Sequence, residues 1–145
     1  MKTKLLLAAF VLVVSAFFAA ADDRPVSQTQ LPPAAIAFIN SNFPGEKISY
    51  AMVDDDFIRP DYKVVLSDGT KIQFDNAGRL EKVEAIKSGI PADVIPVQIR
   101  DYVKTHYPDT GFLEYEIDRR TYDVRLTNRL ELKFNSNFNL VEVDD

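Results

Sequence analysis

The sequence predicts an α+β fold of two tandem repeats, each with one helix and about four antiparallel strands, and with the helices packed on one face of the sheet. Two stretches have the apolar spacing of a helix and are bounded by prolines. After each of them the apolar period changes from about 3.6 to 2, which is typical of strands. The apolar positions of the first half recur in the second: Pro44 and Pro108 lie 64 positions apart, and Phe74 and Phe134 lie 60 apart. Repeated apolar positions describe architecture rather than chemistry.

Residues 1–21 have the layout of a secretory signal peptide. A basic start at Lys2 and Lys4 precedes an apolar run and a small-residue exit that ends at Ala21. A membrane anchor is the competing interpretation, but Ser15 interrupts the apolar stretch and the small residues favour cleavage after Ala21. We therefore expect a periplasmic or secreted protein whose mature chain begins at Asp22, with no membrane insertion after cleavage.

Charge and cysteine content exclude several classes of function. Removal of the two signal-peptide lysines changes the net charge from -5 to -7, and no Lys/Arg cluster offsets it. This argues against binding to nucleic acid or to an anionic membrane surface. The chain contains no cysteine, so neither a disulfide nor a lipid anchor on cysteine is available.

The first repeat is expected to span residues 31–84, after a flexible leader at 22–30. Its helix begins at Pro32 and Pro33, because a missing amide costs nothing in the first turn. An apolar stripe follows, and Pro44-Gly45 ends the helix. Strands are predicted where apolar and polar residues alternate, around Ile48–Met52, Tyr62–Leu66 and Ile72–Phe74, followed by a fourth near Leu80.

The second repeat is expected to span residues 95–145, after a linker at 85–94. Its helix carries a stripe from Ile99 to Tyr107 and ends at Pro108. Four strands follow, at Leu113–Ile117, Tyr122–Leu126, Leu130–Phe134 and Leu140–Val143.

Each predicted sheet has a face that its helix does not need. Polar side chains on this face include Lys63, Lys71, Gln73, Arg125 and Lys133, with Glu114, Glu116 and Glu131 among their neighbours. A solvated face with cross-strand ion pairs is one interpretation. A shallow docking surface for another protein is the other.

Five short motifs of the first half belong together: Leu31-Pro32, Asn42-Phe43-Pro44-Gly45, the strand Tyr62 to Leu66, the turn Ser67-Asp68-Gly69-Thr70 and Phe74-Asp75. With these motifs the chain resembles the PepSY-like domain family, in tandem form. The duplicated form is similar to secreted beta-lactamase-inhibitor-like proteins of Bacteroides-type bacteria. The second unit departs from the pattern, because Thr127-Asn128-Arg129 replaces the Ser-Asp-Gly turn.

The resemblance implies a fold similar to that of beta-lactamase inhibitory protein, and a protein that restrains a secreted peptidase or another hydrolase. We therefore expect an exported, non-enzymatic protein that binds a protein partner. The alternative is an envelope module that holds a peptide, a glycan or an ion on the open sheet face.

The two repeats differ most between their first and second strands, where residues 53–61 correspond to a turn of four residues at 118–121. The longer stretch contains the candidate partner-binding residues Asp54, Asp55, Asp56, Phe57, Ile58 and Arg59. The apolar pair could anchor a partner's cleft, with the aspartates as a polar rim. It could equally extend the second strand and fold back on the sheet.

The sequence offers little for catalysis, metal or cofactor binding. His106 is the sole histidine, and its place at a helix end favours capping over catalysis. We therefore expect no catalytic residue, no metal and no cofactor. The three consecutive aspartates are a weak calcium signal, because no calcium-loop spacing follows them. A carboxylate pair for glycosidase chemistry stays open, since 22 acids are present.

Overall fold

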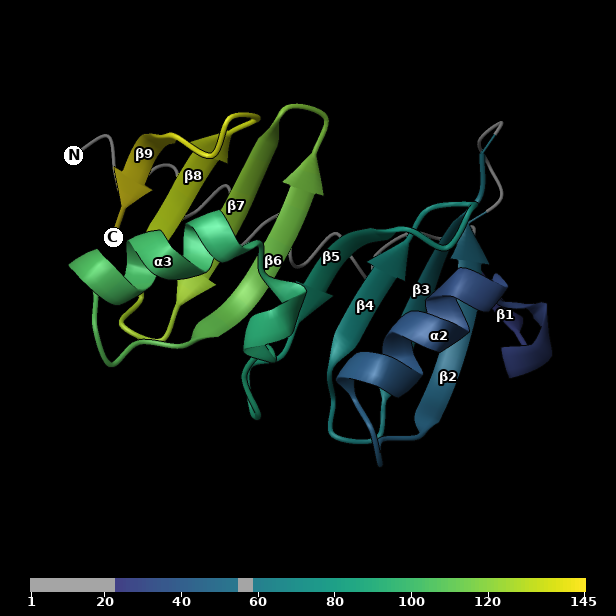
Figure 1. The fold of residues 1–145 in the computed structure, drawn as a ribbon. Helices are drawn as coiled ribbons and strands as arrows, with labels where there is room; N and C mark the ends of the chain where they lie inside the picture. Colours follow the sequence, from purple (N-terminus) through teal and green to yellow (C-terminus); the bar gives the residue numbers. More distant parts are fainter. Residues whose placement is uncertain (1–22, 55–58) are drawn as a thin grey trace.

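The computed structural model describes residues 23–54 and 59–145, and there the strands form one nine-stranded antiparallel sheet (Figure 1). The strands lie in the sheet in the order in which they occur in the chain. They are β1 (Asp23–Val26), β2 (Ile48–Asp54), β3 (Asp61–Leu66), β4 (Lys71–Phe74), β5 (Leu80–Glu84), β6 (Phe112–Asp118), β7 (Thr121–Leu126), β8 (Glu131–Asn135) and β9 (Leu140–Asp144). The α-helices of the described ranges are α2 (Pro33–Asn42) and α3 (Val97–His106), and the short 3-10 helices there are η1 (Gln28–Gln30) and η2 (Ala92–Val94).

The predicted fold class of two tandem helix-plus-strand repeats is wrong. The strands do not divide into two sheets, because β5 pairs directly with β6 and joins the halves into one ladder. Most of the described fold is therefore sheet, and α2 and α3 are its α-helices. The physical reason is that a strand at the edge of a four-stranded unit presents unpaired backbone groups, and the neighbouring edge satisfies them.

The segment that we expected to be a flexible leader contains β1. Its four residues pair with β2 from Asp23 opposite Asp54 to Val26 opposite Ala51. The residues of β1 show no apolar alternation, so the strand cannot be recognised in the sequence. An edge strand can lack this alternation because it needs little apolar surface.

Prolines and chain reversals bound the helices. Pro33 occupies the first turn of α2, and the Phe43 amide bonds the Ile39 carbonyl at 2.8 Å to close its last turn. In α3 the Tyr107 amide bonds the Val103 carbonyl at 2.7 Å. Within the described ranges, no helix combines the length and the apolar composition that a membrane crossing requires.

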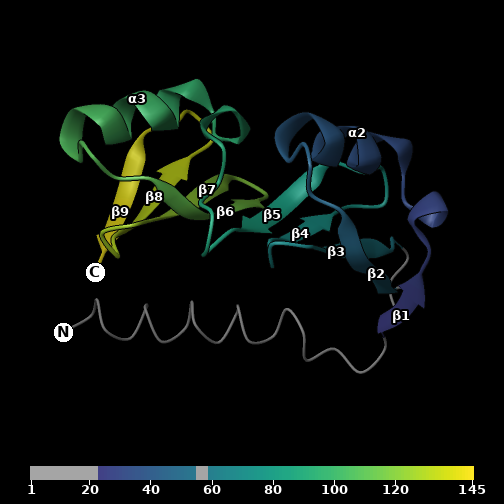
Figure 2. The same cartoon turned by 90° about the horizontal axis from the view of Figure 1, so that it is seen from below.

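The apolar core lies between the helices and one side of the sheet. Both helices are on this side (Figure 2). Phe38 of α2 packs edge-on against Phe74, with ring centroids 5.6 Å apart, and Tyr102 of α3 packs in the same way against Phe134 at 5.4 Å. Alternate strand residues point away from this core, and they form the second face of the sheet.

Candidate functional site

Two rows of polar side chains cross the face of the sheet that points away from the helices, which we call the polar face. Residues that lie opposite one another on neighbouring strands share a face. The first polar row follows the register from β3 to β9: Lys63, Gln73, Lys82, Glu116, Asp123, Lys133 and Glu142. The second polar row follows it from β4 to β9: Lys71, Glu84, Glu114, Arg125, Glu131 and Asp144.

The first polar row is balanced in charge and held by ion pairs. Lys133 Nζ lies 4.0 Å from a carboxylate oxygen of Asp123 and 3.8 Å from one of Glu142. Lys63 is buried, and its Nζ bonds the carboxylate of Asp23, two strands away, at 2.9 Å. Pairs of this kind position the side chains across the sheet more than they stabilise the fold.

The second polar row carries an excess of carboxylates, four against two cations. Glu84 and Glu114 lie directly opposite each other on β5 and β6 and are both buried. Arg125 contacts Glu114 at 3.3 Å, and Lys71 lies 3.9 Å from Glu84. Burial first, and then the charge of Glu84, raises the pKa of Glu114.

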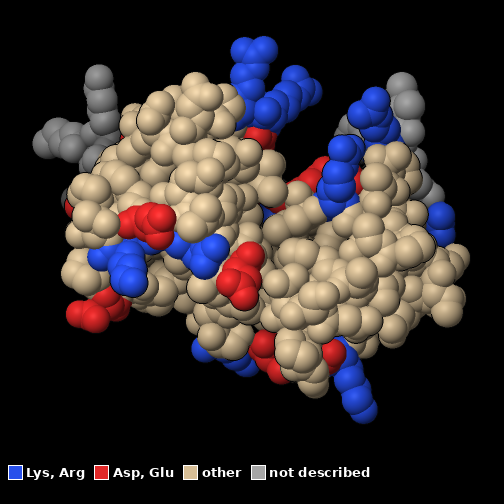
Figure 3. Space-filling model, viewed as in Figure 1, with Lys and Arg blue, Asp and Glu red and all other residues tan. Residues whose placement is uncertain are grey.

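A cavity of about 700 Å³ opens where β5 and β6 stop pairing, and we call it the notch. Three register pairs join these strands, from Lys82 opposite Glu116 to Glu84 opposite Glu114. Beyond Lys82, β5 and β6 diverge. At the same place a bulge interrupts the pairing of β5 with its other neighbour, β4. Lys and Arg side chains stand on both sides of the hollow, with acidic side chains between them (Figure 3). The walls come from β4, β5 and β6 with their turns: Gln73, Asp75, Arg79, Leu80, Glu81, Lys82, Glu116, Ile117, Asp118 and Arg119.

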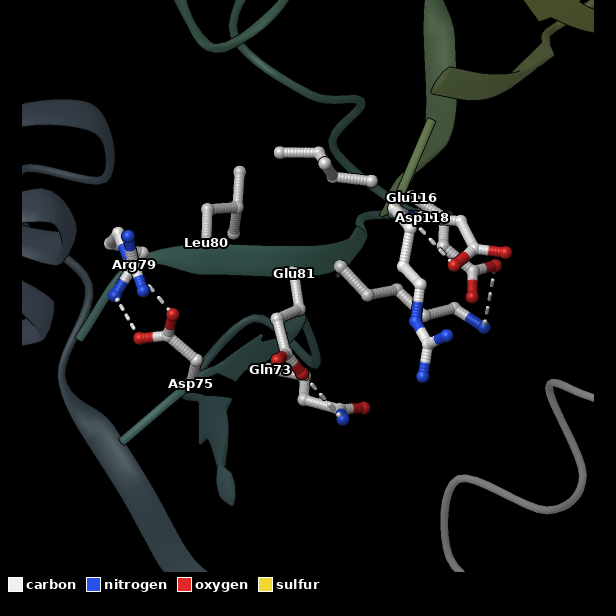
Figure 4. A pocket seen from close by; sticks show the side chains of 10 residues that line it. Gln73, Asp75, Arg79, Leu80, Glu81, Glu116 and Asp118 are labelled. Atoms are coloured by element: carbon white, nitrogen blue, oxygen red, sulfur yellow. Dashed lines mark hydrogen bonds and ion pairs between the residues drawn. The ribbon is translucent and has the colours of Figure 1, made fainter. Parts of the chain in front are cut away.

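Several charges in the notch are already paired (Figure 4). Arg79 Nε bonds the Asp75 carboxylate at 2.8 Å, and Lys82 Nζ lies 3.9 Å from that of Glu116. Gln73 donates its amide to Glu81 at 3.0 Å. Figure 4 shows Glu81 and Gln73 together on the same side of β5.

The carboxylates around the notch have different proton affinities. Burial first, and then the charge of Asp61, raises the pKa of Glu81. Asp75 behaves in the opposite way: burial opposes the shift, but hydrogen bonds from Arg79 and Ala77 lower its pKa. Both oxygens of Asp75 thereby serve the β4–β5 turn.

The sequence left glycosidase chemistry open, and that chemistry would require a pocket lined by acidic side chains. The notch meets this requirement only in part. Asp75 is occupied by its turn, and Glu116 by Lys82. No aromatic side chain is among the residues that line the notch, so a sugar ring would find no stacking platform there. Of the four carboxylates that line the notch, Glu81 and Asp118 form no ion pair with a described residue.

The structure describes only part of the predicted loop site. Asp54 ends β2, and Arg59 is exposed just before β3. Asp55, Asp56, Phe57 and Ile58 lie outside the described residues. The loop after β2, the β4–β5 turn and the β6–β7 turn all leave the same end of the sheet, because successive hairpins alternate between its ends. The described part of the loop therefore shares an end with the notch.

The predicted open-face residues do share one face. Lys63, Gln73 and Lys133 belong to the first polar row, and Lys71 and Arg125 to the second. Sequence reasoning missed Glu81, Asp118 and Arg119 in the notch. The polar residues at 75–79 and 118–121 indicate turns in the sequence, but they do not indicate a cavity. The notch exists because β5 and β6 diverge, which the sequence does not show.

His106 lies at the end of α3, as its spacing predicts. Its ring stacks on that of Tyr102, with centroids 4.0 Å apart, and Nδ1 is 2.9 Å from the Tyr102 carbonyl oxygen. Within residues 23–54 and 59–145, no three potential Asp, Glu or His ligands come close enough together to hold a metal ion.

Comparison with known proteins places this fold among periplasmic proteins. The family model described as "putative beta-lactamase-inhibitor-like, PepSY-like" matches residues 60–142. No curated protein matches the sequence. A "putative periplasmic protein" of the DUF2874 family from Bacteroides vulgatus is 37% identical, with a TM-score of 0.84 over 88% of this chain and 100% of its own.

Two further solved structures are similar. A "putative calcium-regulated periplasmic protein" from Bacteroides thetaiotaomicron is 40% identical, with a TM-score of 0.82 over 86% of this chain and 98% of its own. A "putative periplasmic protein of unknown function" from Bacteroides vulgatus is 27% identical, with a TM-score of 0.79 over 85% and 99%. These neighbours confirm the predicted periplasmic or secreted location.

Proposed function

Because the chain belongs to the PepSY-like, beta-lactamase-inhibitor-like family, we propose that it is a non-enzymatic binding protein that restrains a secreted or periplasmic hydrolase. The polar face is the docking surface in this proposal. The enzyme's rim would lie across the strands, and the rigid sheet would hold the two polar rows against it.

One observation carries the proposal: the polar face is a broad, preorganised array of charges. Its side chains are fixed in register by backbone pairing across seven strands, β3 to β9. Several are partly exposed, including Lys71 at 30% and Lys133 at 38% of the side chain. A rigid surface loses little conformational entropy on binding, which favours affinity.

Charge complementarity would select the partner. Exposed lysines next to a surplus of carboxylates present both signs of charge within a few strands. A partner must match this pattern, because like charges brought together at an interface cost several kcal/mol. The polar face is therefore suited to specific recognition of a partner more than to nonspecific binding.

The test begins with capture from the periplasmic fraction of the native host, using immobilised mature protein from Asp22. The captured enzyme is then purified and assayed with and without the protein. We expect inhibition that saturates at one molecule per enzyme. A variant with Lys71→Glu and Lys133→Glu should lose capture and inhibition together, because it reverses two partly exposed charges of the polar face.

Two controls make the result interpretable. Lys87→Glu with Lys104→Glu makes the same charge change at exposed positions outside the polar rows, and it should inhibit normally. Phe57→Ser with Ile58→Ser tests the predicted loop anchor separately. If the face variant inhibits as well as the unchanged protein, the polar face is not the docking surface. If purified partners are captured but never inhibited, the proposal of restraint fails.

A further inference from the structure

We propose that the outer edge of β9 binds an extended segment of the partner, in the register in which β6 binds β5, with basic side chains opposite Glu142 and Asp144 and an apolar one between them. This inference rests on the proposed function, since it assumes a protein partner. It deepens that function by naming a second contact, made by backbone pairing at the carboxyl-terminal edge of the sheet, and the kind of segment that fits it.

The strand β9 is the last of the sheet, and no described strand pairs with its outer side (Figure 1). Its counterpart in the first half is β5, in which Val83 occupies the place of Val143. A register shift at Phe74 or Phe134 interrupts the ladder of each strand with its inner neighbour. The outer side of β5 is covered by β6. The equivalent side of β9 is the one that stays open in the described chain.

The backbone of β9 directs unpaired groups outward at Val143. Next to β5, the Ala85 amide bonds the Leu113 carbonyl at 2.8 Å. Hydrogen bonds of an antiparallel strand alternate between its two neighbours, so Val83, two residues earlier, also directs its amide and carbonyl toward β6. At the corresponding place in β9, Val143 directs its amide and carbonyl away from β8, where no described strand accepts them. Extended peptides bind such an edge by adding a strand.

Features that often protect a sheet edge do not close this one. Bulges and charged side chains both discourage strand addition, and β9 has both. However, β5 has the same bulge and carries Lys82 and Glu84, and it still pairs with β6 at these residues. The opposite edge of the sheet differs, because Pro25 in β1 lacks an amide for an added strand. Of the two edges, β9 is therefore the one that fits a further strand.

The apolar surface at this edge indicates what an added strand would cover. Val83 is fully buried, whereas Val143 is 40% exposed and its neighbour Val141 is 54% exposed. In the first half, Val83 lies opposite Tyr115 of β6, which is itself buried. An apolar or aromatic residue opposite Val143 would bury the valine in the same way, and burial of apolar surface favours binding.

Charge complementarity selects a basic segment. On the polar face, β8 and β9 carry three carboxylates and one cation: Glu131, Glu142, Asp144 and Lys133. Lys133 is shared between Glu142 and Asp123. A second copy of β9 would bring the same acidic residues together, and contact between like charges is unfavourable. A segment with lysine or arginine on both sides of an apolar residue would instead place its cations on the polar face, because alternate residues of a strand share a face.

Amide hydrogen exchange of the mature protein, followed by nuclear magnetic resonance, tests the inference with defined probes. A short capped peptide that alternates valine and lysine is compared with one that alternates valine and glutamate. In the free protein we expect the Val143 amide to exchange rapidly and the Val83 amide slowly. With the basic peptide at about ten times its Kd, exchange at Val143 should slow about tenfold. Val83 should not change, and the acidic peptide should affect neither amide.

Two pairs of variants separate the backbone pairing from the charges. Val143→Pro removes the outward amide and should abolish peptide binding, whereas Val143→Thr keeps the amide and should still bind. Glu142→Gln with Asp144→Asn should weaken the basic peptide about tenfold. Asp93→Asn with Asp109→Asn makes the same change in net charge at exposed positions outside the polar rows, and it should bind normally. Circular dichroism and the melting temperature verify that each variant is folded.

Three results would overturn the inference. The first is rapid exchange at Val143 that the basic peptide does not slow. The second is slow exchange at Val143 in the free protein, because the edge would then be covered already. Protection that rises with protein concentration would identify a second copy as the cover. The third is binding of the peptide to Val143→Pro as tightly as to the unchanged protein.

Failure of this inference is distinguishable from failure of the proposed function. A hydrolase that is inhibited equally by the unchanged protein and by Val143→Pro contradicts the edge contact alone. A basic peptide that protects the Val143 amide while no hydrolase is inhibited supports the edge contact and contradicts the proposed function.

Discussion

Glu131 is the residue whose acidity the fold alters most clearly in the second polar row. Burial first raises its pKa, Arg125 opposes this, and the charge of Glu114 raises it further, so that the pKa reaches about 7 instead of 4.5. Between pH 4.5 and 7 the folded chain therefore holds a proton that the unfolded chain has released. The folded state gains stability as the pH falls through this window and loses it as the pH rises.

We predict that the free energy of unfolding is higher at pH 5 than at pH 7.5. Glu131→Gln should flatten this dependence by about 1 kcal/mol, a value reduced from the full linkage because water screens a half-exposed group. Asp123, whose pKa burial raises to about 6, should leave a residual slope. Urea unfolding at a series of pH values measures both. Parallel curves for the two proteins would contradict the role of Glu131.

Some of the residues with a positive φ angle could be predicted from their residue type, and others could not. Gly69 has a φ of 89°, as its Asp-Gly turn predicts. At the corresponding place in the second half Arg129 adopts a φ of 74°, and Phe138 has a φ of 62° while stacking on Tyr122 at 4.9 Å between centroids. Nothing in the residue types Arg and Phe signals this conformation, because tertiary contacts impose it.

At the scale of elements, the β4–β5 turn is fitted closely against the start of α2. Gly78 has a φ of 84°, and a Cβ at this position would lie 2.8 Å from the Ala35 backbone nitrogen and 2.9 Å from the Pro32 Cβ. Glycine is therefore required here for space as well as for conformation. This contact fixes the height at which α2 sits over the sheet.

Gly78→Ala should accordingly destabilise the fold by about 3 kcal/mol, the sum of backbone strain and a steric clash. Gly69→Ala is the matched control: its φ is 89°, but nothing lies within 4 Å of the added Cβ. It should cost only about 1 kcal/mol from strain. Thermal unfolding of both variants measures the difference. Equal destabilisation by the two substitutions would show that α2 shifts to accommodate the added Cβ and that its contact with Gly78 is not close.

Most helices and strands could be predicted from the sequence, because their periodicity is strong and prolines bound them. The stripe of α3 and the alternation around Val64 and Val124 each produced an element where expected. β1 could not be predicted, since its residues Asp23 to Val26 carry no pattern. Its position depends on the long-range pairing of Asp23 with Lys63 and on the β2 ladder.

At the scale of the whole molecule, the halves of the chain share one sheet through a short joint. Lys82, Val83 and Glu84 pair with residues 114–116, and two of the three pairs involve charged residues on both strands. Sequence periodicity cannot predict such pairing, because apolar alternation reports which side a residue faces and not which strand lies beside it. This is why the single sheet, and with it the notch, escaped prediction.

The continuous ladder predicts a single cooperative unfolding transition. Scanning calorimetry should give a calorimetric enthalpy equal to the van't Hoff enthalpy, as for most chains of this size. Val83→Ala, at a fully buried position in the joint, should lower the melting temperature without splitting the transition. Two resolved transitions would show instead that the halves fold independently and that the joint is weak.

The order of the strands also bears on how the protein reaches its compartment. Every strand pairs with the strands next to it in the chain, from β1 to β9. An exported chain enters the periplasm gradually from its amino-terminal side, and each hairpin can close as soon as its second strand has crossed. No strand has to wait for a distant partner still inside the cell. Such local pairing speeds folding and shortens the time for which sheet edges are exposed to aggregation or proteolysis.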